Sequence, residues 1–142
     1  MSGPRPAGYT LLEIMVVVFI LGLLATLVAP KILGRTEDAR RTKAIADMKA
    51  IEQALNLYRL DTGTYPTTAQ GIDALVHKPE TPPVPRGWKA DGYLERVPLD
   101  PWGHAYIYVY APGDSRFVLR SYGADGVEGG EGKYADLDSR EF

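Results

Sequence analysis

The sequence has 142 residues, enough for one modest domain together with a membrane anchor. It contains 16 basic and 18 acidic residues, which gives a net charge of -2. The chain therefore lacks the excess of positive charge that is typical of nucleic-acid-binding domains. Cysteine is absent, which excludes a disulfide framework, a thiolate metal site and a cysteine nucleophile. An exported domain of this composition therefore needs some other stabiliser.

A long apolar segment lies close to the N-terminus. From Ile14 to Ala29 the only polar side chain is that of Thr26. With the two leucines before Glu13, the run reaches about 20 residues, or about 30 Å as a helix, which is one hydrocarbon thickness. Its Leu, Ile, Val and Phe residues contribute on the order of -6 kcal/mol to insertion, whereas a carboxylate in lipid costs about 3 kcal/mol. The segment is therefore predicted to enter the membrane although it carries Glu13.

Three interpretations of this segment are open from the residues alone. A cleaved signal peptide fits poorly, because Arg5 is its only basic side chain and the long run ends at Pro30 without a clean A-x-A site. A plain anchor explains the run but leaves the acid without a role. Cleavage after Gly8 would instead create an ammonium at Tyr9, and that charge can pair with Glu13 in the same chain or in a neighbouring one.

The pattern G8-Y-T-L-L-E13, followed by the apolar run, resembles the class III signal of type IV pilins and pseudopilins. In that family a membrane-embedded prepilin peptidase cuts after the glycine, here Gly8, and the new first residue, here Tyr9, is N-methylated. The family usually has Phe or Met in the place of Tyr9. The resemblance implies a cleaved leader at residues 1–8, a transmembrane and filament-core helix at residues 9–34, and a periplasmic globular domain at residues 35–142.

The charges that flank the apolar run favour the opposite membrane orientation, with the C-terminal domain in the cytoplasm. Arg5 alone precedes the run and five basic residues follow it, so the positive-inside rule by itself puts the C-terminal domain in the cytoplasm. The resemblance implies the reverse, because the leader is processed on the cytoplasmic side. We adopt the second orientation, a single pass through a bacterial inner membrane with the C-terminal domain in the periplasm. The basic residues after the run are Lys31, Arg35, Arg40, Arg41 and Lys43.

One helix is predicted from about Tyr9 to Asp61. Pro30 lacks an amide donor and clashes with the preceding turn, so an interruption is expected there, and Pro30 joins Glu13 as a candidate assembly residue. Gly63 supplies a stop signal. Beyond the interruption, apolar residues recur at steps of three or four and mark one buried face, which consists of Ile45, Met48, Ile51, Leu55 and Tyr58.

The rest of the chain predicts a small antiparallel sheet. Residues 67–78 begin with capping-box spacing and predict a short helix, and the proline-rich residues 79–88 predict a packed loop. The period-two segments Ala105–Tyr110 and Arg116–Tyr122 predict two strands joined by a hairpin turn. As an alternative to packing in a core, the strand tyrosines could stack on nucleic acid. The sequence shows no basic patch that would support such binding. The predicted fold class is α+β and type IV pilin-like, with a long N-terminal helix packed on this sheet.

A glycine-rich acidic stretch follows the second strand. Residues 121–138 place five acidic residues among glycines, and calcium takes six to eight hard oxygens that often include main-chain carbonyls. Glycines allow such carbonyls to turn inward. The EF-hand pattern is not met, because Val127 and Gly129 stand where Asp or Asn belong. From the residues alone, a solvated acidic loop and a calcium-binding C-terminal loop both remain open.

The C-terminal half of the chain resembles one particular family within the pilins and pseudopilins. YPTTAQGIDALV, GYLERVPLDPWGHAY and SYGADGVEGGEG together resemble the major pseudopilin of the type II secretion system. In that family the glycine-rich loop binds calcium where other pilins close the loop with a disulfide. Carried over by residue, the resemblance implies ligation by the carboxylates of Asp125 and Asp136 and by the carbonyls of Tyr122 and Val127. Asp138 could replace or join Asp136, because the tail departs from the family's usual ending.

No catalytic constellation is present in the sequence, so the chain is not expected to be an enzyme. The resemblance implies a structural subunit of the pseudopilus that polymerises through its N-terminal helix and drives export of folded proteins across the outer membrane. The implied partners are other copies of the chain, minor pseudopilins, the prepilin peptidase and the inner-membrane secretion platform, without nucleic acid. Two alternatives remain, a type IV or competence pilin for adhesion or DNA uptake, and an anchored periplasmic calcium-binding module that works as a monomer.

Overall fold

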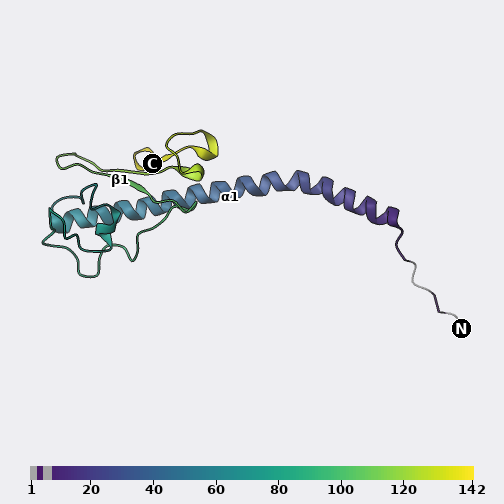
Figure 1. The fold of residues 1–142 in the computed structure, drawn as a ribbon, viewed down its shortest axis with the longest axis horizontal. Coiled ribbons are helices and arrows are strands. Elements are labelled where there is room, and N and C mark those ends of the chain that lie inside the picture. Colours follow the sequence, from purple (N-terminus) through teal and green to yellow (C-terminus); the bar gives the residue numbers. More distant parts are fainter. Residues whose placement is uncertain (1–2, 5–7) are drawn as a thin grey trace. The chain divides into compact units, whose positions relative to one another are not determined.

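The computed structural model describes residues 3–4, 8–28 and 34–142, and the chain divides into two compact units, Met1–Asp38 and Ala39–Phe142. The helix α1 contributes to both units (Figure 1). The regular elements, in chain order, are α1 (Leu11–Thr62), η1 (Ile72–Leu75), β1 (Ile107–Val109), β2 (Val118–Ser121), η2 (Gly123–Asp125), η3 (Gly132–Tyr134), β3 (Leu137–Asp138) and η4 (Ser139–Glu141).

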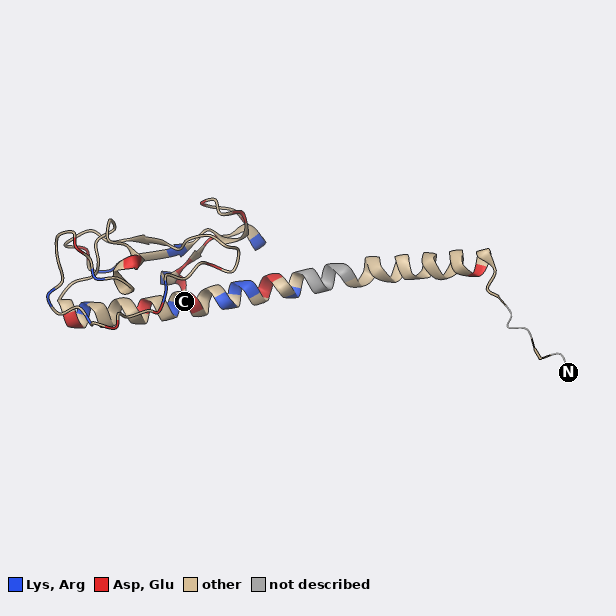
Figure 2. Cartoon of the chain, turned by 60° about the horizontal axis from the view of Figure 1, so that its bottom comes forward, with Lys and Arg blue, Asp and Glu red and all other residues tan. Residues whose placement is uncertain are grey.

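The first unit contains the apolar beginning of α1. Leu11–Val28 is long and apolar enough to cross a membrane, and none of this stretch is buried within the chain. Each of its large apolar side chains is at least 48% exposed. Figure 2 shows this part of the helix without charge except for one acidic position at its beginning. Such a surface requires lipid or partner helices around it, because water does not stabilise a helix that is apolar on all sides.

The bounds of α1 agree with the sequence prediction within a few residues. The helix begins at Leu11, two residues after Tyr9, and ends at Thr62. Gly63 follows with φ 86°, and its amide donates to the carbonyl of Arg59 at 2.8 Å, which is the left-handed C-terminal cap that the sequence indicated. The interruption predicted near Pro30 falls on residues 29–33, which lie outside the described residues.

The second unit is built on the buried face of α1. Met48, Ile51 and Leu55 are completely buried, whereas Leu57 on the opposite face is 54% exposed. Figure 1 shows the later part of the helix running alongside the strands. The predicted face is therefore confirmed, with Ala44 and Ala54 added to it and Ile45 only partly buried. Alanines on this face let the helix approach its neighbours closely.

The sheet has three antiparallel strands in the order β1-β2-β3. Tyr108 pairs with Leu119 in the first ladder, and Arg120 pairs with Asp138 in the second. The two predicted strands are present but shorter, and the first ends before Tyr110, whose backbone bonds to Thr68 instead of to a strand. The third strand was not predicted, since two residues are too few to show a period-two pattern.

The tyrosines of the first strand face the core. Tyr106, Tyr108 and Tyr110 are each no more than 8% exposed, and the hydroxyl of Tyr108 donates to the carbonyl of Pro66 at 2.7 Å. Burial raises the pKa of Tyr106 and of Tyr108 well above the ordinary range. Tyr65 packs edge-on against Tyr110 with ring centroids 5.3 Å apart. These rings are packing residues, and they offer no stacking platform for nucleic acid.

The predicted short helix at residues 67–78 is only a single 3₁₀ turn, η1. The capping-box pair does form, since the amide of Thr67 donates to Oε1 of Gln70 at 3.1 Å and the amide of Gln70 donates to Oγ1 of Thr67 at 3.2 Å. Gly71 then takes φ 63°, outside the helical region, and ends any continuation from the box. The capping box predicted from Thr67 and Gln70 is therefore present, and Gly71 prevents a longer helix from following it.

The proline-rich segment is a packed loop, as the sequence predicted. The indole of Trp88 donates to the carbonyl of Ala74 at 2.9 Å, and the hydroxyl of Tyr93 donates to the carboxylate of Asp61 at 2.8 Å. The latter bond and the partial burial of the ring raise the pKa of Tyr93 to about 12, with burial as the larger cause. The loop is thereby tied to the C-terminal end of α1.

Candidate functional site

The first candidate site is the N-terminus of α1, where Glu13 completes a capping box with Thr10. The amide of Thr10 donates to Oε2 of Glu13 at 2.9 Å, and the amide of Glu13 donates to Oγ1 of Thr10 at 3.2 Å. Each residue thus satisfies a backbone donor that the first turn of a helix leaves without a partner. The acid is therefore a structural part of the helix start as well as a charge in an apolar segment.

The capping box also decides what lies outside the helix. Gly8, Tyr9 and Thr10 are exposed and precede the first helical residue, so the Gly8–Tyr9 peptide bond is non-helical. A peptidase needs an accessible bond outside regular secondary structure, and this bond meets both conditions. The roles assigned to Gly8, Tyr9 and Glu13 from the sequence stay predictions, and the sequence analysis missed Thr10, although the T-x-x-E spacing carries that signal.

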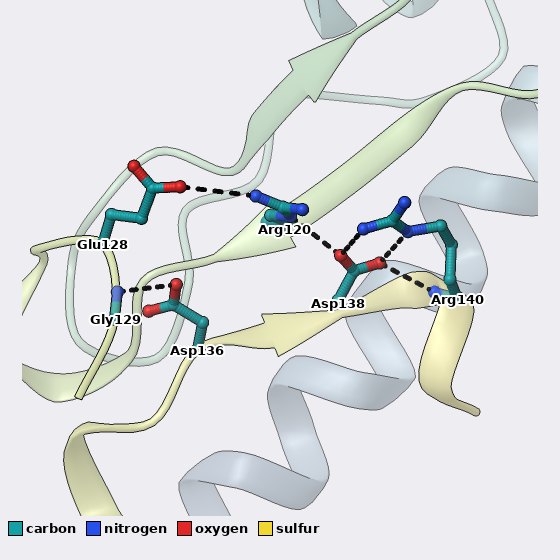
Figure 3. A network of polar contacts seen from close by, with 6 residues as sticks. All are labelled: Arg120, Glu128, Gly129, Asp136, Asp138 and Arg140. Atoms are coloured by element: carbon teal, nitrogen blue, oxygen red, sulfur yellow. Dashed lines mark hydrogen bonds and ion pairs between the residues drawn. The ribbon is translucent and has the colours of Figure 1, made fainter. Parts of the chain in front are cut away.

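The second candidate site is the loop that joins β2 to β3, with the 3₁₀ turns η2 and η3 within it. Asp125 Oδ1 accepts from the amide of Val127 at 3.2 Å. Asp136 Oδ2 accepts from the amide of Gly129 at 2.9 Å, and this bond joins the two halves of the loop (Figure 3). Each carboxylate therefore uses one oxygen inside the loop.

The other oxygen of Asp136, Oδ1, is buried and has no hydrogen-bond partner among the described residues. A buried carboxylate oxygen without a partner costs free energy unless a cation or a donor reaches it. No group of three His, Cys, Asp or Glu side chains gathers in the described part of the chain, so a cation here would need main-chain carbonyls as well. The positive φ values of Gly123 and Gly126 permit the backbone turns that such carbonyls require.

Asp138, the third candidate carboxylate, is occupied by arginines (Figure 3). Its Oδ2 accepts from Nη2 of Arg140 at 2.6 Å and from Nε of Arg120 at 2.8 Å, and its Oδ1 accepts from Nε and from the amide of Arg140. The hydrogen bonds from Arg140, helped by Arg120, hold the pKa of Asp138 well below its usual range. Both oxygens are used, which argues against Asp138 as a cation ligand.

A buried carboxylate, Asp100, anchors the beginning of the loop. Its Oδ1 accepts from the amides of Trp102 and His104, and its Oδ2 accepts from the hydroxyl of Ser121 at 2.8 Å. The ring of His104 lies against Gly126, where an added Cβ would approach the ring to 2.9 Å. The turn at residues 100–104 therefore contacts the glycine-rich loop through His104 and Asp100. No local sequence pattern predicts these contacts.

Comparisons with known proteins give concordant results. The family model of type II secretion system protein G matches residues 31–140, and the model of the prokaryotic N-terminal methylation motif matches residues 4–29. The two matches together span both candidate sites.

Individual relatives agree with the family models. The type II secretion system core protein G of Pseudomonas aeruginosa is 51% identical over 138 residues, which covers 96% of each chain. That of Vibrio cholerae is 52% identical over 134 residues, covering 94% of this chain and 90% of the relative. Among solved structures, the major pseudopilin of the type 2 secretion system of enterohaemorrhagic Escherichia coli aligns with TM-score 0.67 at 40% identity, covering 78% of this chain and 94% of that one.

The depressed pKa of Asp138 predicts a pH-dependent loss of stability in the Asp138→Asn variant. Because the folded-state pKa lies below the unfolded value of about 4, the charged form stabilises the fold fully above pH 4, and this stabilisation is lost as the pH falls through the folded pKa. We expect Asp138→Asn to lower the free energy of unfolding by about 1–2 kcal/mol at pH 7, with a smaller difference below pH 4. Urea unfolding of the full chain in detergent, followed by tryptophan fluorescence, measures both.

The matched control is Asp114→Asn, which removes a carboxylate from an exposed turn and keeps an oxygen able to accept from the amide of Ala111. It should leave the free energy of unfolding nearly unchanged. A difference between wild type and Asp138→Asn that stays constant down to pH 2.5 contradicts the prediction.

Proposed function

The chain belongs to the family of type II secretion system protein G, and from this membership we propose that it is the major structural subunit of the pseudopilus. The observation that carries the proposal is the uncovered apolar surface of Leu11–Val28. A single chain leaves that surface bare, and lipid before assembly and neighbouring helices after assembly can both cover it. Polymerisation through this helix would drive export of folded proteins across the outer membrane.

Processing at the N-terminus is the first step of this proposal. The methylation-motif match at residues 4–29 supports cleavage after Gly8 by a prepilin peptidase, followed by N-methylation of Tyr9. The bond to be cut lies outside the helix that the capping box begins. Residues 1–8 are the leader in this scheme, and the mature chain begins at Tyr9, directly before Thr10 of the capping box.

The membrane topology follows from the same processing. The apolar segment would cross the inner membrane once, with residues 35–142 in the periplasm and the filament assembled there. The minor pseudopilins and the inner-membrane secretion platform are the proposed partners besides other copies of the chain. The basic flank after the apolar segment opposes this orientation by the positive-inside rule, and processing of the leader on the cytoplasmic side is the overriding argument.

Glu13 would have two successive partners. In the uncut chain it accepts from the amide of Thr10. After cleavage, the new ammonium of Tyr9 lies close to the helix start, where a positive charge is unfavourable for the helix dipole and a carboxylate compensates it. We propose that Glu13 pairs with the Tyr9 amine of a neighbouring copy and so favours one register of assembly. In lipid such a pair is worth more than in water, because the solvent screens it little.

Calcium is the proposed ligand of the glycine-rich loop. The unpartnered oxygen of Asp136 is the feature that supports it. The carboxylates of Asp125 and Asp136 and the carbonyls of Tyr122 and Val127 would hold the ion, whereas the arginines around Asp138 make that residue a structural ion pair. Bound calcium would supply positive charge that closes the loop, so its binding free energy becomes folding free energy in a chain without disulfides.

Gly8→Ala should block removal of the leader. Intact mass of the membrane-extracted protein then shows the uncut chain, and secretion stops. Wild type should appear without residues 1–8 and one methyl group heavier than the bare sequence. Gly3→Ala is the matched control, since an added Cβ meets nothing within 4 Å at either glycine, and it should be processed normally. Normal processing of Gly8→Ala contradicts the proposed cleavage site.

Glu13→Gln separates the two roles of the acid. The amide oxygen of Gln can still accept from Thr10, so helix start, insertion and cleavage should persist, whereas the ion pair is lost. We expect filaments sheared from cells to fall below detection for Glu13→Gln and Glu13→Leu alike. Filament yields of both variants at the wild-type level would overturn the assembly role of Glu13, whereas a wild type that yields no filaments would favour the anchored monomer. Assembly of Glu13→Gln alone would mean that capping, not charge, is what assembly needs.

Asp125→Ala should lower the melting temperature of the full chain much more when calcium is present. With excess chelator, the variant still loses the exposed hydrogen bond from the amide of Val127, so its melting temperature should lie only about 1–2 °C below that of wild type. Glu131→Ala, in the same loop but outside the proposed ligand set, controls for the loss of negative charge. A wild-type melting temperature that does not respond to calcium removes the proposed site.

A further inference from the structure

A single contact ties the glycine-rich loop to helix α1. Nη1 of Arg41 donates to the main-chain carbonyl of Ala135 at 3.0 Å, across 94 residues of sequence, and the bond is partly buried. Arg41 lies near the start of the second compact unit, Ala39–Phe142. The contact therefore joins the first part of the helix that belongs to the globular domain to the last part of the loop.

The carbonyl of Ala135 occupies a junction within the loop. It also lies over Gly123, where an added Cβ would come within 3.0 Å of the carbonyl oxygen. Gly123 follows Tyr122 at the beginning of the loop, whereas Ala135 stands at its end. The two ends of the loop therefore meet at the carbonyl of Ala135, and Arg41 on α1 donates a hydrogen bond to that carbonyl.

The neighbour of Ala135 in the chain is Asp136, whose Oδ1 is buried without a partner. Fixing the carbonyl of one residue restrains the backbone from which the next side chain projects. A ligand side chain that is already restrained loses less conformational entropy when the ion binds, and this raises affinity without any new contact to the ion. Among the described hydrogen bonds and ion pairs, none joins Arg41 to a proposed ligand, so it would act through the backbone.

Coupling of this kind is reciprocal. If the bond from Arg41 favours the closed loop, then a closed loop favours the bond, and the helix segment around Arg41 becomes more stable when the loop is occupied. We propose that Arg41 is a positioning residue that couples divalent-cation binding in the loop to the stability of α1 where the globular domain begins. This inference rests on the proposed calcium site.

Calcium titration of the full chain in detergent, after chelator treatment, tests the coupling by isothermal titration calorimetry. Arg41→Met keeps the aliphatic stem and removes the donor, and we expect its Kd for calcium to be about five- to tenfold higher than that of wild type. Lys43→Met is the matched control, because it removes one positive charge from the same helix and its partner is Asp47. Its Kd should stay within about twofold of wild type.

Hydrogen exchange supplies a readout that a merely structural role does not move. In wild type, calcium should slow amide exchange in residues 39–45 of α1 as well as in the loop, and in Arg41→Met it should slow exchange in the loop alone. Arg41→Lys, which keeps the charge and can be used if Arg41→Met fails to fold, should give a Kd between those of wild type and Arg41→Met.

The two proposals fail differently. If wild type releases no heat with calcium, the calcium site itself is wrong and the coupling falls with it. If wild type binds calcium and Arg41→Met binds with the same Kd, or if calcium still slows exchange at residues 39–45 in that variant, the calcium site stands and the role of Arg41 is overturned.

Discussion

The burial of one face of α1 is the constraint on which the globular domain depends. Met48, Ile51 and Leu55 are completely buried, and the tyrosine side of the sheet packs with them in one core. A three-stranded sheet of such short strands is not stable alone, so it needs a helix to cover it. The loops follow from this arrangement, because the packed proline-rich segment and the glycine-rich segment each reach back to α1.

The same helix meets the opposite requirement in its first unit. Leu11–Val28 carries apolar side chains on every side, and none of this stretch is buried within the chain. One helix thus joins two chemical environments, and the capping box of Thr10 and Glu13 defines where it begins. A backbone end in or near lipid has little water to satisfy its amides, so a reciprocal cap has greater value there than on a soluble helix. The acid that looked anomalous in an apolar segment has a local structural reason, the capping box, besides its proposed role in assembly.

The glycine-rich loop closes the domain in a chain without cysteine. Polar contacts from three other parts of the fold hold it, namely Ser121 with Asp100, Asp138 with its two arginines, and Ala135 with Arg41. These contacts lie at the two ends of the loop, and among the described residues Oδ1 of Asp136 is left buried without a partner. For the proposed cation, contacts that restrain the loop before binding would reduce the conformational entropy lost on binding.

The sequence by itself determined the long helix, its membrane-compatible first half, its buried second face and the stop at Gly63, because these depend on periodicity and on local backbone preferences. It also pointed to Gly8, Glu13, Asp125 and Asp136 as the residues to test. Only the tertiary structure decided which groups these side chains meet. The bond from Arg120 to Asp138, the bond from Arg41 and the short third strand all join residues distant in sequence, and such contacts leave no local pattern from which they could be predicted.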